Sequence, residues 1–177
     1  MKLLLPLISL AFSLAAAGFN YPGQIKLRNQ TKPLRVTVSK VDQWGNIFCR
    51  HQKKNMIIRS RSYIWVMVDK PDILKMAEKS LKDGQYIAAG NAFRDAEKMV
   101  GKLGWKLTCV YGQAAIFHYQ EKDADALALL EPCLTYKMSY PKGERPQLDQ
   151  CLMLLSQLAK PEKAMEALAL LRESNSP

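Results

Sequence analysis

The sequence predicts an α+β fold in which a small β-sheet is followed by a stack of helical hairpins. Short runs with a period of two occupy residues 21–68, and amphipathic segments with a helical period follow residue 71. In this second part a spacing of small and apolar residues returns after 37 and then 38 residues. We expect four parts: a leader (1–17), a basic β-module (18–70), helical repeats (71–174) and a polar tail (175–177).

The first 17 residues have the pattern of a secretory signal peptide. Lys2 precedes an apolar run over residues 3–16, and Ala15-Ala-Ala17 forms an A-x-A cleavage site before Gly18. The alternative is a membrane anchor, but the run is shorter than the ~20 residues that a spanning helix needs. The residue directly after the cleavage site is Gly18 and not a cysteine, which argues against a lipoprotein. The leader therefore predicts an exported protein, periplasmic or secreted.

Short strands are predicted between Tyr21 and Val68. Apolar residues alternate or cluster at 36–41, 47–48, 56–58 and 63–68, and Trp44-Gly45-Asn46 supplies a turn. An isolated hairpin would be unstable, so four or five strands in this space favour a small sheet or an SH3-like barrel.

The positive charge of the chain is concentrated in this module. The whole chain has a formal net charge of +10, residues 18–70 contribute +9, and residues 71–177 are neutral. One interpretation is binding to an anionic envelope polymer or a membrane surface; the other is that the cations protect sheet edges and maintain solubility. No nucleic-acid signature is present, so we expect no nucleic-acid partner. The candidate polyanion-binding residues are Lys26, Arg28, Lys32, Arg35, Lys40, Arg50, Lys53, Lys54, Arg59 and Arg61.

The helical part repeats one spacing three times. Its copies are Ala89/Phe93/Ala96, Ala126/Leu130/Cys133 and Ala164/Leu168/Leu171. An amphipathic segment precedes each copy, at residues 71–82, 105–119 and 146–158, and short turns join the members of each pair. The chain therefore predicts three helix-turn-helix units.

The first copy resembles the tetratricopeptide repeat (TPR) family. Gly84, Tyr86, Ala89, Phe93 and Ala96 match the second-helix signature of that family. The resemblance covers residues 71–174 and implies an α-helical hairpin solenoid of about three TPR-like repeats, which binds a protein or peptide partner.

The resemblance also implies where a partner would bind, namely on the inner face of each first helix. In the second and third units these positions are Tyr111, Ala115, His118, Tyr119, Asp149 and Met153. Two tyrosines and a histidine on adjacent turns offer rigid contact area and hydrogen-bonding groups. Alternatively, these aromatic residues fill the gap to the neighbouring repeat. In the first unit the corresponding residues are Leu74, Glu78 and Leu81.

All four cysteines follow the leader, so an oxidising compartment would permit disulfides. Across one predicted hairpin, Cys109 and Cys133 stand at similar distances from the turn. Across the next turn, Cys133 and Cys151 form the competing pair, whereas Cys49 is far away in the β-module. Buried free thiols at close helix crossings are the alternative to both pairs.

Catalytic and metal-binding signatures are absent from the sequence. Cys49 and His51 share one face of a strand, but two ligands without a partner pair make a poor zinc site. No recognised catalytic motif occurs. We therefore expect no enzymatic activity, metal or cofactor. The leading hypothesis is an exported scaffold or adaptor that binds a protein or peptide, and the alternative is a basic β-module that anchors to anionic polymers or lipid head groups. The sequence does not indicate an oligomeric state.

Overall fold

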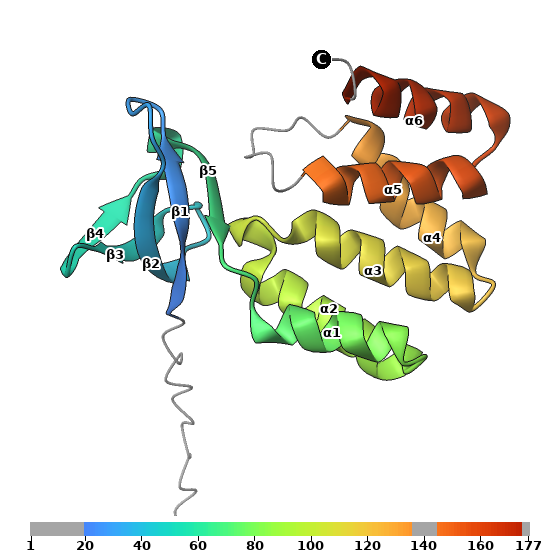
Figure 1. Ribbon diagram of the computed structural model, residues 1–177, viewed down its shortest axis with the longest axis horizontal. Coiled ribbons are helices and arrows are strands. Elements are labelled where there is room, and N and C mark those ends of the chain that lie inside the picture. Colours follow the sequence, from blue (N-terminus) through green and yellow to red (C-terminus); the bar gives the residue numbers. More distant parts are fainter. Residues whose placement is uncertain (1–19, 136–144, 175–177) are drawn as a thin grey trace, which may run out of the picture.

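The computed structural model describes residues 20–135 and 145–174 (Figure 1). These residues form a five-stranded antiparallel sheet followed by six α-helices, which is an α+β arrangement. The predicted leader (1–17) and the predicted tail (175–177) lie outside the described residues.

The sheet has the strand order β4-β3-β2-β1-β5, and every pair is antiparallel. The first four strands form a meander, and β5 returns to pair with β1. A short 3-10 turn, η1 (Ser60–Ser62), lies between β4 and β5. The strands are β1 (Tyr21–Leu27), β2 (Leu34–Val41), β3 (Ile47–His51), β4 (Lys54–Ile58) and β5 (Tyr63–Val68).

The alternation predicted for the strands is confirmed in β2, where Val36 and Val38 are buried and Arg35 between Leu34 and Val36 is exposed. Gly23 in β1 is required by the close approach of β5, because a Cβ atom there would lie 2.5 Å from the backbone oxygen of Met67. The sheet therefore has one apolar face toward the helices and one solvated face.

A hydrogen bond joins the β2–β3 turn to the start of β5. Asp42 accepts hydrogen bonds from the backbone N–H groups of Trp44 and Asn46. The hydroxyl of Tyr63 donates to the backbone oxygen of Gly45 over 2.9 Å. This turn was predicted from Trp44-Gly45-Asn46, and Gly45 has a positive φ of 80° that favours glycine.

The helices form three hairpins, α1/α2, α3/α4 and α5/α6, and each helix packs against its partner (Figure 1). In addition α3 packs against α1 and α2, and α5 packs against α3 and α4. The elements are α1 (Asp72–Lys82), α2 (Tyr86–Val100), η2 (Gly101–Leu103), α3 (Lys106–Tyr119), α4 (Asp123–Leu130), η3 (Glu131–Thr135), α5 (Arg145–Leu158) and α6 (Pro161–Ser174).

The first two copies of the repeated spacing are buried. In the first copy Phe93 packs so closely on α3 that a Cβ atom at Gly112 would lie 2.4 Å from its ring. The third copy differs, because Leu168 is 39% exposed while Ala167 is fully buried. The physical reason is position: within the described residues α6 has α5 and η3 as its main neighbours, so one of its faces stays in solvent.

Two hydrophobic clusters form the interior. The first core contains the inner face of the sheet, α1 and α2. It also contains Trp105, which directly precedes α3, and Cys109 and Ile116 of α3. The second core is built from α3, α4, η3, α5 and α6. The indole N–H of Trp105 donates to the backbone oxygen of Val68 over 2.9 Å, which joins β5 to the entry of α3.

Candidate binding groove

A groove of about 590 Å³ lies between α1, α3 and α5, the first helices of the three hairpins. Its position follows from the packing of α1 on α3 and of α3 on α5. The groove is lined by Lys70, Glu78, Leu81, Lys82, Gly84, Tyr86, Phe93, Thr108, Tyr111, Tyr119, Gln147 and Gln150.

Three tyrosines form the aromatic part of the groove. Tyr86 and Tyr119 stack with ring centroids 5.5 Å apart and an angle of 19° between the ring planes. Tyr111 is half-buried and lies about two helical turns before Tyr119 on α3. Burial raises the pKa of Tyr111, and the nearby Tyr119 adds to the effect, so the Tyr111 hydroxyl stays protonated at neutral pH and is available as a donor.

Thr108 brings a buried hydroxyl to the groove. The residue is 8% exposed, and its side-chain oxygen has no hydrogen-bond partner among the described residues. An unpaired buried hydroxyl costs roughly 1–3 kcal/mol. Because this oxygen has almost no accessible surface, the polar groups that the groove presents to an occupant include those of Tyr111, Tyr119 and Gln150.

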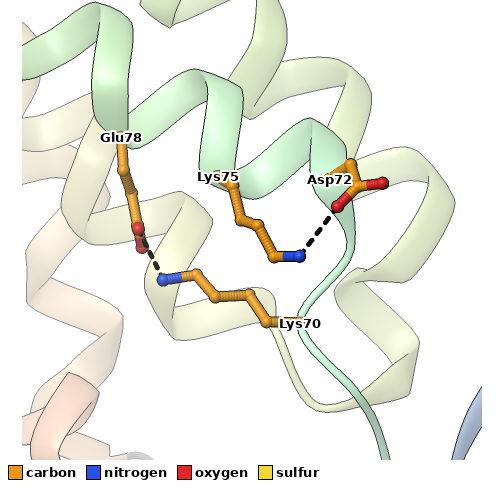
Figure 2. Close-up of polar contacts among 4 residues, drawn as sticks. All are labelled: Lys70, Asp72, Lys75 and Glu78. Carbon is orange, nitrogen blue, oxygen red and sulfur yellow. Dashed lines mark hydrogen bonds and ion pairs between the residues drawn. The ribbon is translucent and has the colours of Figure 1, made fainter.

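Two of the three charged residues that line the groove, Lys70 and Glu78, are paired with each other. Lys70 follows β5, and its ammonium group points toward the Glu78 carboxylate of α1 at 2.5 Å (Figure 2). The same ammonium lies 5.9 Å from the centre of the Trp105 ring. A separate pair, Lys75 with Asp72, lies on the exposed side of α1 (Figure 2). The rim therefore favours contact area and hydrogen bonding over strong attraction of one charge.

The structure brings part of the predicted set together. Tyr111 and Tyr119 line the groove, together with Glu78 and Leu81 of the first unit. In contrast, Leu74 is fully buried in the first core and does not line the groove.

Ala115 and His118 lie elsewhere on α3. Ala115 is buried in the second core, because this side of α3 faces α4 and α5. His118 is exposed at the end of α3, where its Nδ1 lies 2.8 Å from a carboxylate oxygen of Asp123. Neither side chain lines the groove between α1, α3 and α5.

The predicted residues of α5 also lie outside the groove lining. Asp149 is half-buried, and Met153 is 54% exposed. The groove uses Gln147 and Gln150 instead, which are nearer the start of α5. Sequence reasoning missed Lys82, Tyr86, Thr108 and both glutamines because the position of the groove along each helix depends on how the hairpins are offset. The i, i+3 spacing of Gln147 and Gln150 was the available signal.

All four cysteines are buried free thiols. Cys133 and Cys151 are neighbours in the second core, whereas Cys109 belongs to the first core. The structure thus brings together the second of the two predicted pairs and separates Cys109 from Cys133. Burial, with a contribution from nearby Glu97, raises the pKa of Cys109 to about 12, which suppresses thiolate chemistry there.

The cations of the β-module are at the surface; of the ten predicted polyanion-binding residues, Lys26 is half-buried and the rest are exposed. The register places Arg35 opposite Gln24, and Arg50 opposite Thr37, on the solvated face of the sheet. Arg28 donates from its Nε to the backbone oxygen of Arg61 over 3.1 Å, which gathers cations beside η1.

Comparison with models of known protein families, with curated proteins and with solved structures gives no match to this chain. Over residues 20–135 and 145–174, no helix combines the length and apolar character required to cross a membrane. Within the same residues, no three His, Cys, Asp or Glu side chains are grouped so that they could hold a metal ion.

Proposed function

We propose that this protein is an exported, non-enzymatic scaffold or adaptor of the cell envelope, which binds a protein or peptide segment in the groove between α1, α3 and α5. The observation that carries the proposal is the groove along the first helices, which is lined by tyrosines and glutamines. A polypeptide matches this lining, because its backbone supplies hydrogen-bonding groups and its side chains supply apolar area.

Three features support the description of the helices as a TPR-like solenoid. The helices pair through short turns, first helices contact first helices, and α3 and α5 each also pack on the second helix of the preceding hairpin. Small or apolar residues are buried at equivalent positions of α2 and of α4 with η3. A groove along the first helices is the consequence of this type of stacking. The strand order and η1 likewise support an SH3-like description of the β-module.

The proposed function is tested by screening wild-type protein against an immobilised peptide array and measuring Kd for the peptides that bind. We expect the double substitution Tyr111→Ala/Tyr119→Ala to weaken binding at least about tenfold, because aromatic contacts dominate such interfaces. Tyr111→Phe keeps the ring but removes the hydroxyl, and it should weaken binding by roughly two- to tenfold.

Met153→Ala is the matched control, because Met153 is exposed on α5 but outside the groove lining. It should bind like the wild type. Peptides that bind wild type and both groove variants with equal Kd would overturn the proposal, provided that the variants keep the wild-type circular dichroism.

A second candidate function is anchoring of the β-module to an anionic envelope polymer or lipid surface. It is favoured by the exposed cations of the module, which far outnumber its two acidic residues, Asp42 and Asp69. Ionic strength separates the two functions in the same experiment. Binding to vesicles with anionic lipid should collapse between low and physiological salt, whereas groove binding should change little.

A further inference from the structure

Two thiols meet in the second core where η3 packs against α5. Cys133 on η3 is 4% exposed, Cys151 on α5 is fully buried, and the two thiols are near enough to shift each other's pKa. The Cys151 sulfur also lies 3.6 Å from the backbone oxygen of Leu107 on α3. The other buried residues of this core are leucines and alanines.

This contact is more specific than packing of two small apolar residues. A disulfide requires cysteines on elements that are packed against each other, and η3 and α5 meet this requirement within one core. The interaction between the two thiols lowers the pKa of Cys133 and raises that of Cys151, as expected when one thiol supports the thiolate of the other. Burial opposes the thiolate at Cys133, and the nearby Lys106 favours it.

Other uses of the pair fit the surroundings less well. A metal site needs further ligands, and the described residues place no third His, Cys, Asp or Glu with the two thiols. A catalytic thiol needs access to substrate, but both sulfur atoms lie in the interior. The remaining two cysteines, Cys49 and Cys109, belong to the first core.

We propose that Cys133 and Cys151 form a structural disulfide that pins η3 to α5. The oxidant is a small-molecule or protein disulfide, which is the class that the predicted export of the chain would supply. The Cys133 thiolate attacks one sulfur of that disulfide and expels one thiolate. The Cys151 thiolate then attacks the Cys133 sulfur in the mixed disulfide and expels the second thiolate. One S–S bond is formed and one is broken, and both protons end on the two thiols released.

The position of this bond explains what it would stabilise. Residues 136–144 connect η3 to α5, so the α5/α6 hairpin joins the chain through that segment. The crosslink closes a ring between positions 133 and 151, 18 residues apart, and limits the freedom of the unfolded chain. It also holds α5, which carries Gln147 and Gln150, against η3.

The test uses the full chain, unfolded and then refolded with glutathione disulfide so that burial does not limit oxidation. The product is denatured, alkylated without reductant and weighed by mass spectrometry. We expect two alkylated thiols, at Cys49 and Cys109, and four after reduction. Trypsin cleaves after Lys137 and Lys142, between the two cysteines, so the peptides holding Cys133 and Cys151 should stay joined until reduced.

Two variants form the control. Cys109→Ala should give one alkylated thiol before reduction and three after it, whereas Cys133→Ala should give three in both cases. Oxidised wild-type protein should also melt roughly 5–10 °C above the reduced protein, and Cys133→Ala should lose that difference. Four alkylated thiols in refolded wild type, or a joined peptide that contains Cys49 or Cys109, would overturn the proposal. The peptide map needs no variant, so failure of a variant to fold does not affect the result.

Discussion

The first core and the second core differ in how tightly their elements are interlocked. The first core includes the large side chains of Phe93 and Trp105, and backbone approaches such as that of Gly112 leave no room for a methyl group. The second core consists chiefly of leucine, alanine and cysteine. The first core also crosses the change from strands to helices near residue 70. A change of secondary structure is therefore not a break in packing, and the sheet and the first hairpin share one hydrophobic core.

The largest effect is expected where the first core is tightest. In Gly112→Ala the new methyl group would meet the Phe93 ring, so the ring and α3 must separate. We expect a loss of about 3 kcal/mol in the free energy of unfolding, measured by urea denaturation monitored by circular dichroism. Gly90→Ala is the matched control, because a Cβ atom there meets only an ordinary contact at 3.8 Å.

A double variant sharpens this test. Phe93→Leu alone leaves a cavity and destabilises the protein, but it also frees space for the alanine at position 112. The losses from the two substitutions should therefore add to more than the loss in the double variant. Strictly additive losses would show that Phe93 and Gly112 do not interact as described.

A smaller effect is expected where the sheet joins the helices. Trp105→Phe retains an aromatic ring but removes the N–H that donates to the Val68 oxygen. We expect a loss of about 1–2 kcal/mol in the free energy of unfolding. Amide hydrogen exchange should accelerate in β5 and in α3 together. Faster exchange confined to α3 would contradict the view that the two elements share one cooperative core.

The repeated elements could be predicted from the sequence because they depend on local periodicity. The strand alternation of Val36 and Val38 and the burial of Ala89 and Phe93 are of this kind. The groove was harder, because it depends on how the hairpins are offset. Tyr111 and Tyr119 were found from the helical face, but Thr108 enters the groove only through the placement of α1 against α3. Trp105 could not be predicted as a link, since its partner is a backbone oxygen 37 residues earlier.

The smallest effect is a pH dependence that arises in the first core. The native thiol of Cys109 has a pKa of about 12, against 9.0 without burial. Between these values the unfolded chain releases the proton while the native chain keeps it. The native state is therefore fully stabilised below pH 9 and loses stability as the pH rises, by up to about 1.4 kcal/mol per pH unit.

Cys109→Ala isolates this contribution, because its packing cost does not depend on pH. The difference between wild type and Cys109→Ala in the free energy of unfolding, measured under reducing conditions, should shrink by roughly 1 kcal/mol between pH 8 and pH 10. A difference that stays constant would mean that the thiol ionises as readily in the folded protein as in the unfolded chain. Water would then reach α3 beneath the sheet, and the tighter packing assigned to the first core would have to be abandoned.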